Sequence, residues 1–232
     1  MKLVRLNKAF TPYDNIFKYV ETLDDNVNAI VIALDSLIHK DKSEFVQHYK
    51  ESALRLTEKG YSDLYKPNVI ALYTLLEAAV RDLITALFKE YKTTLDKVKE
   101  VQKIKISVIE FETLTEHERY DYLYSEYERD VVKGEKYGVS RFKKLLDPLG
   151  INIIVEDENE KVILELAQIR NCIIHRNAIV DKKLLTECPW LKSDYKIGDE
   201  IIIMQKHFKR YIHSVIVFSS DLEEAVREYI TS

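Results

Sequence analysis

Turn-forming residues are scarce in this chain, which has only five Gly and four Pro among its 232 residues. Because Gly and Pro are the strongest local breakers of regular structure, their scarcity predicts few turns and long helices. No window approaches the roughly 18 uninterrupted apolar residues of a membrane-spanning helix, and the segment 1–10 lacks the apolar core of a signal peptide. We therefore expect a cytoplasmic protein that is neither inserted into a membrane nor secreted.

Several chemical motifs are also missing. The two cysteines, Cys172 and Cys188, are too few and too irregularly spaced for a disulfide scaffold or a zinc site. The chain has no glycine-rich phosphate loop and no Ser-His-Asp order typical of hydrolases. Its formal net charge of -4 argues against a protein that coats nucleic acid nonspecifically, although local basic patches remain compatible with it. The sequence thus predicts neither a metal ion nor a cofactor.

Apolar spacing predicts most of the architecture. Hydrophobic residues at 46% and charged residues at 32% are typical of globular proteins. Helical spacing predicts helices over residues 11–39, 41 or 43 to 59, 67–91, 116–130, 140–149, 161–175 and 205–229. Two β-branched runs, 151–155 and 200–204, read as short strands that are able to pair. We expect an all-α antiparallel helical bundle with a minor two-stranded hairpin.

The expected organisation is one domain over residues 1–232, in which 1–60 form an N-terminal helical hairpin and 67–232 form the core bundle. Thr11 and Pro12 supply a cap and a first helical residue, and Pro67 opens the next long helix. Thr115 and Glu118 form a capping box, and Gly60 is expected to end the second helix. The stretch 67–91 is hydrophobic on nearly all sides, which predicts a central helix.

Arg170 stands where its own helix requires a hydrophobic residue. At about 100° per residue it falls in the middle of an apolar arc. The arc consists of Val162, Ile163, Leu166, Ala167, Ile169, Ile173 and Ile174. A guanidinium stays charged, so a buried one needs a carboxylate, a phosphate or a wet cleft. Glu77 is a similar anomaly in the helix 67–91. We predict that the two face each other, because burying either charge alone would cost more.

His175 lies five residues after Arg170, roughly 140° further around the helix and near its expected end. The run Arg170-Asn171-Cys172-Ile173-Ile174-His175 therefore has the form R-N-x-x-x-H. With a second helix that buries a Glu, this pattern resembles the HEPN superfamily, whose helical bundles carry an R-x4-6-H motif. The resemblance covers mainly residues 67–91 and 161–177, together with the GDEI segment from Gly198 and the helix after it.

The resemblance implies a metal-independent endoribonuclease of a toxin–antitoxin, abortive-infection or other phage-defence system. It also implies an active site in a cleft at a two-fold homodimer interface, RNA as the substrate, and an antitoxin or defence-system protein as a further partner. The chemistry of the residues agrees with this. Cleaving RNA without a metal requires a base for the 2′-OH proton, an acid for the departing 5′ oxygen and a cation for the phosphate.

We assign catalysis to Arg170 and His175. An imidazole with an unperturbed pKa of about 6.5 can perform either proton transfer, and a guanidinium binds phosphate oxygens bidentately. Asn171 would hold the phosphate or orient the imidazole, and Arg176 and Asn177 would contact phosphates. Glu77 would hold Arg170 in place. The product would carry a 2′,3′-cyclic phosphate.

Plainer interpretations remain open. One is a helical scaffold in which Arg170 and Glu77 form a buried salt bridge, His175 interacts with free helix-end carbonyls, and the residues after it cap the helix. Another is a catalytically silent module of the same superfamily that binds RNA or a protein partner. A tyrosine stripe at 120, 124 and 127 would stack bases or simply pack on a neighbour. A basic cluster at 133–144 is expected to be a solvated face.

Overall fold

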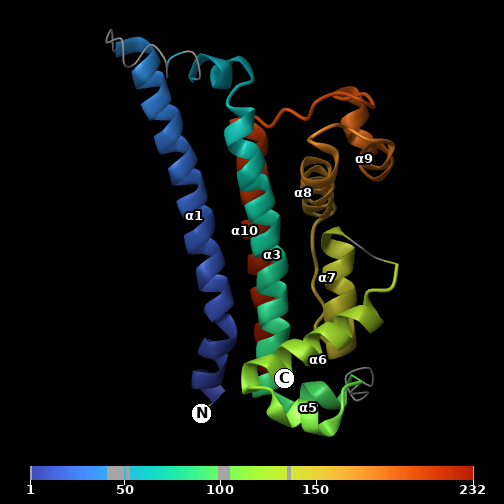
Figure 1. The fold of residues 1–232 in the computed structure, drawn as a ribbon. Coiled ribbons are helices and arrows are strands. Elements are labelled where there is room, and N and C mark those ends of the chain that lie inside the picture. The colour runs from blue at the N-terminus through green and yellow to red at the C-terminus, as the bar shows by residue number, and fades with distance from the viewer. Residues whose placement is uncertain (1, 41–49, 51–52, 99–104, 135–136, 232) are drawn as a thin grey trace. The chain divides into compact units, whose positions relative to one another are not determined.

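The computed structural model describes residues 2–40, 50, 53–98, 105–134 and 137–231 (Figure 1). In this part of the chain the protein is helical and contains no strand, which confirms the predicted all-α bundle. In chain order the helices are α1 (Lys2–Lys40), α3 (Ser62–Glu90), α4 (Lys92–Asp96), α5 (Val108–Thr113), α6 (Glu116–Val131), α7 (Gly138–Leu146), α8 (Asp157–Arg176), α9 (Lys182–Glu187) and α10 (Gln205–Thr231). Two 3-10 turns, Asp147–Leu149 and Pro189–Ser193, follow α7 and α9.

The chain groups into two compact units. One unit comprises Met1–Ile16, Leu76–Glu160 and Val217–Ser232, and the other comprises Phe17–Leu75 and Lys161–Ile216. We call them the first and the second unit. Helices α1, α3, α8 and α10 contribute residues to both. This grouping differs from the expected division into residues 1–60 and 67–232, and the single domain stays a prediction.

The first unit packs the end of α3 against α6 and α7. Phe88 and Tyr127 meet edge to face with ring centroids 5.5 Å apart, and the buried Tyr127 hydroxyl donates to the Leu145 carbonyl at 2.6 Å. Phe142 packs on Phe218 of α10. Helix α6 begins at the predicted capping box, since Thr115 and Glu118 satisfy each other's backbone donors. Aromatic packing and a capped start therefore fix α6 on its neighbours.

The second unit is built from the beginning of α3, most of α8 and the beginning of α10. Tyr65 of α3 packs on Phe208 of α10 with ring centroids 5.5 Å apart. The buried Ser62 hydroxyl accepts a hydrogen bond from the Ile203 backbone N–H at 2.9 Å, which fixes the chain just before α10. Helix α8 buries Ile163 and Leu166 completely. These contacts place the end of α8 beside the start of α3, where the candidate site lies.

The predicted hairpin is wrong. Residues 151–155 are extended, and Ile151 and Ile153 are buried whereas Ile154 is 83% exposed, but no described strand pairs with them. Glu200 instead forms a single antiparallel bridge with Ile179. Ile201 and Ile203 of the second run are buried as well, so burial of the two runs does not require a ladder between them.

Several predicted helix starts are also wrong. Helix α1 runs through Pro12 and α3 begins at Ser62, so that Pro67 lies inside α3. Proline cannot donate the helical hydrogen bond, but its fixed φ is helical, and residues on both sides of it keep the helix continuous. Most of the predicted second helix, 41–49 and 51–52, lies outside the described residues. Its expected stop is confirmed, because Gly60 has φ +57°.

Candidate functional site

The R-N-x-x-x-H motif forms the last two turns of α8. Three acidic residues in the first turn and His175 and Arg176 in the last turn match the helix dipole, which favours anions at the start and cations at the end. The expected apolar arc is buried as far as Ile169 but not beyond, since Ile173 is half-buried and Ile174 is 41% exposed. The motif thus lies where α8 emerges from the core.

Arg170 is half-buried and its partner is an amide. Its Nη1 donates to Asn171 Oδ1 at 3.2 Å. Arg170 Nε and Asn171 Nδ2 are buried, and neither atom has a hydrogen-bond partner among the described residues. Buried donors are almost always satisfied by protein, water or a ligand, so these two donors on adjacent residues need a partner that the described residues do not supply.

Glu77 and Arg170 have partners other than those expected. In the first unit, Arg141 of α7 donates both to Glu77 of α3 and to Glu128 of α6. In the second unit, Arg170 has Asn171 as its partner. Arg141 therefore offsets the negative charge of both Glu77 and Glu128. Arg170 donates to Asn171, and the role expected for Glu77 in holding Arg170 stays a prediction.

His175, Arg176 and Asn177 are all exposed at the end of α8. Arg176 Nε lies 3.5 Å from Asp181 Oδ2, a weak surface pair. Asn177 and Ala178 both have left-handed backbone conformations, with φ of +53° and +60°. The second is costly for a residue with a Cβ, and it is held by a hydrogen bond from the Ala178 N–H to the Cys172 carbonyl at 3.0 Å. These two residues turn the chain sharply away from the motif.

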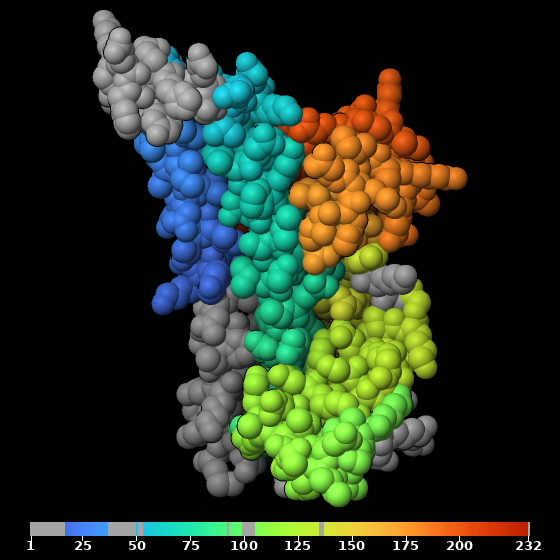
Figure 2. Space-filling model, viewed as in Figure 1, coloured from blue at the N-terminus to red at the C-terminus, as the bar shows by residue number. Residues whose placement is uncertain are grey.

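The segment after α8 closes on itself. Val180 N–H donates to the Asp199 carbonyl and Gly198 N–H to the Val180 carbonyl, both at 2.9 Å. Ile201 N–H donates to the Ala178 carbonyl at 2.8 Å. Figure 2 shows part of this segment, in orange, at the molecular surface. The closure brings Glu200 back beside the end of α8.

Sequence reasoning missed a buried carboxylate in α8. Glu165 is 2% exposed and accepts from Trp190 Nε1 and from the Tyr211 hydroxyl, each at 2.7 Å, and also from Arg210. Burial, followed by the charge of Glu165, raises the pKa of Tyr211 well above its ordinary value. The available signal was the apolar spacing around Glu165, which shares its helix face with Ile169 four residues later. This network fixes the segment after α8 to the rest of the second unit.

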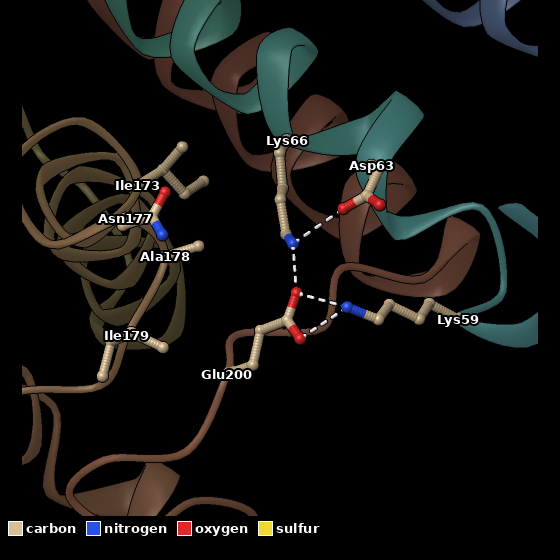
Figure 3. A pocket seen from close by; sticks show the side chains of 8 residues that line it. All are labelled: Lys59, Asp63, Lys66, Ile173, Asn177, Ala178, Ile179 and Glu200. Carbon is tan, nitrogen blue, oxygen red and sulfur yellow. Dashed lines mark hydrogen bonds and ion pairs between the residues drawn. The ribbon is translucent and has the colours of Figure 1, made fainter. Parts of the chain in front are cut away.

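A pocket of about 430 Å³ opens next to the motif (Figure 3). One side is formed by the end of α8 and the residues after it, and the other by Lys59, Asp63, Lys66 and Glu200. Lys59 and Lys66 bind the two oxygens of Glu200 at 2.7 and 2.8 Å. Hydrogen bonds from Lys59 and then Lys66 lower the pKa of Glu200 to about 2. Asn177 lines this pocket, whereas Arg170 and His175 do not.

No protein-family model, curated protein or solved structure matches this chain. The interpretation of the site therefore depends on the chemistry of its residues. Among the described residues, no group of three or more His, Cys, Asp or Glu side chains is placed to hold a metal ion. No helix in the described ranges is sufficiently long and apolar to cross a membrane.

Other candidate residues are buried or paired with carboxylates. Tyr124 and Tyr127 are buried, so these two tyrosines pack on neighbours and are not available to stack bases. Arg141 and Lys143 of the expected solvated basic face are paired with carboxylates, Lys143 with Glu160. Cys172 and Cys188 are buried, free thiols. The exposed residues of the predicted site are therefore His175, Arg176 and Asn177, at the end of α8.

Proposed function

We propose that this chain is a metal-independent endoribonuclease of the HEPN type. One observation carries the proposal: Arg170 is a half-buried cation whose partner is the neutral amide of Asn171. A half-buried guanidinium that has no carboxylate partner in the described part of the chain favours binding of an anion, and the phosphate of RNA supplies one with the bidentate geometry that Arg prefers. The salt-bridge interpretation loses support because Glu77 pairs with Arg141 among the described residues.

The proposed roles follow from exposure and chemistry. His175 is exposed in the last turn of α8, where its imidazole is accessible to a 2′-OH or to a departing 5′ oxygen. Arg170 would stabilise the charge that develops on the phosphate. Asn171 would hold the guanidinium in place and share the phosphate through its unsatisfied Nδ2 donor. Arg176, exposed and only weakly paired, would contact a neighbouring phosphate.

The proposal includes a homodimer. A chain of net charge -4 offers one Arg170–His175 pair, and a two-fold axis beside α8 would bring two pairs together and focus positive potential on RNA. We expect light scattering to give the mass of a dimer at micromolar concentration. A strict monomer that still cuts RNA would contradict this arrangement. A toxin or defence effector in the cytoplasm, controlled by a protein partner, is the proposed setting.

An RNA cleavage assay in EDTA tests the proposal. His175→Ala and Arg170→Ala should each lower the cleavage rate by about 100-fold to 10,000-fold, since the first removes the acid–base group and the second removes the cation that stabilises the charge on the phosphate. His213→Ala is the matched control, because His213 is an exposed histidine of α10 outside the site. The products should carry a 2′,3′-cyclic phosphate. Dependence on Mg²⁺, or full activity without His175, would contradict the mechanism.

A catalytically silent module that binds RNA or a protein is the second candidate. It is favoured by the burial of Arg170 Nε, which a phosphate in solvent reaches only after the side chain moves. RNA binding without cleavage, abolished in Arg170→Ala, would select this candidate. Cleavage that depends on His175 would exclude it.

A further inference from the structure

The pocket beside the motif contains an anion that belongs to the protein itself. Glu200 places one carboxylate oxygen 2.7 Å from Lys59 Nζ and the other 2.8 Å from Lys66 Nζ (Figure 3). Lys66 also contacts Asp63 at 2.9 Å, and its side chain is only 12% exposed. Two ammonium groups that converge on one carboxylate form a geometry that a phosphate can occupy equally well, because both anions accept charge-assisted hydrogen bonds.

The opposite side of the pocket has a different chemistry. Ile173 and Ile179 supply apolar surface, and Ile179 is 37% exposed. Asn177 supplies an exposed amide that both donates and accepts hydrogen bonds. An amide of this kind can pair with the edge of a base, as Asn does with adenine. The backbone turn at Asn177 and Ala178, both with positive φ, holds this amide at the pocket rather than along the axis of α8.

The size of the pocket agrees with a ligand of nucleotide dimensions. Its volume of about 430 Å³ lies within the range of roughly 300 to 1,000 Å³ that is usual for small-molecule sites. Its lining includes two lysines and two carboxylates, so the formal charges balance while Glu200 is ionised. An incoming phosphate must therefore displace Glu200, which acts as an internal competitor.

We propose that this pocket binds a nucleotide. The phosphate takes the place of the Glu200 carboxylate between Lys59 and Lys66, the base lies against Ile173 and Ile179, and Asn177 contacts the base edge. In an RNA-cleaving protein the pocket receives a nucleotide close to the scissile phosphate, because Ile173 and Asn177 flank His175 in the sequence. This last role rests on the proposed endoribonuclease function, whereas nucleotide binding itself does not.

Binding of a short fluorescent single-stranded RNA, followed by anisotropy, tests the proposal. A 2′-O-methylated strand is used, because it cannot be cleaved by attack of the 2′-OH. Lys66→Ala should weaken binding by about 10-fold, the effect expected for the loss of one charge-assisted hydrogen bond. Glu200→Gln should strengthen binding several-fold by removing the competing charge. A misfolded variant would not bind more tightly, so Glu200→Gln separates the proposal from a loss of stability.

Control variants and competing nucleotides test the position, the base contact and the kind of ligand. Lys192→Ala removes the same charge from an exposed position in the turn Pro189–Ser193, outside the pocket, and should leave the affinity within about two-fold. Asn177→Ala should change the preference among strands that differ in base composition. Competition by the four nucleoside monophosphates would show that free nucleotides enter the pocket. Binding of RNA alone would assign the pocket to a nucleotide within a strand.

The outcomes separate this proposal from the proposed function. If cleavage depends on His175 but neither Lys66→Ala nor Glu200→Gln changes RNA affinity, the pocket proposal is overturned and the endoribonuclease stands. If no RNA is cleaved but affinity falls in Lys66→Ala and rises in Glu200→Gln, the pocket proposal stands alone. If neither RNA nor mononucleotides bind, the pocket proposal is overturned.

Discussion

Replacing Glu165 by Ala should be one of the most damaging single changes in the second unit. The carboxylate is 2% exposed and accepts hydrogen bonds from Trp190, Arg210 and Tyr211. After its removal Arg210 can turn to water, because its side chain is already 43% exposed. The Tyr211 hydroxyl cannot, because that residue is 1% exposed.

The expected loss can be worked out from these contacts. A buried hydroxyl left without a partner costs about 1 to 3 kcal/mol, and hydrogen bonds to a charged group contribute roughly 1.5 to 3 kcal/mol. Some of the second contribution is recovered when Arg210 is hydrated. We therefore expect Glu165→Ala to lower the free energy of unfolding by about 3 to 5 kcal/mol, as for other buried charges that lose a partner. This is a large share of the stability of a typical domain.

Urea denaturation followed by circular dichroism measures the loss, and the single Trp adds a local signal. Because Trp190 donates to Glu165, its native fluorescence should shift to longer wavelength in Glu165→Ala before the protein unfolds. Glu165→Gln, which keeps the size but not the charge, should lie between wild type and Ala. Glu187→Ala removes an exposed carboxylate of α9 and should change stability by less than about 0.5 kcal/mol. An equal effect of Glu165→Ala and Glu187→Ala would refute the reasoning.

Three further predictions follow from charge and burial. The two lysine partners lower the pKa of Glu200 from 4.5 to about 2, so its stabilisation is complete above pH 4.5 and is lost as the pH falls towards 2; acid titration should show a larger loss for wild type than for Glu200→Gln. Burial raises the pKa of the Cys172 thiol, and that of Cys188 to about 12, so mass spectrometry should find neither alkylated by iodoacetamide at neutral pH until the protein is denatured. Arg141→Ala leaves two carboxylates, Glu77 among them, without their shared cation, and should lower the free energy of unfolding by about 2 kcal/mol in thermal denaturation; no change would contradict the bridge.

The helices and some of their ends could be predicted from the sequence. Helical spacing depends only on neighbouring residues, so the all-α class and a buried face along α3, from Tyr65 to Phe88, could be read from it. The Thr115 capping box and the Gly60 stop are equally local, because each involves backbone groups within one turn. The starts at Pro12 and Pro67 were wrong, because helix continuity through a proline depends on contacts that a local rule does not include.

The sequence also showed that Arg170 and Glu77 are charges on apolar helix faces. It did not show which residues contact them. Arg141 is 64 residues away from Glu77 in the sequence. The ion pair between them forms because α3, α6 and α7 pack together in the first unit. Asn171, by contrast, is adjacent to Arg170 in the chain, so that contact was within reach of sequence reasoning.

Tertiary structure alone decided the network of Glu165 and the composition of the pocket. The donors to Glu165 lie 25 to 46 residues further along the chain, and Lys66 and Glu200 are 134 residues apart. Helical periodicity assigns a side chain to a face, but it contains no information on which distant face packs opposite. The tertiary fold decides this packing: the backbone hydrogen bonds of the segment after α8 bring Glu200 to the end of the motif helix.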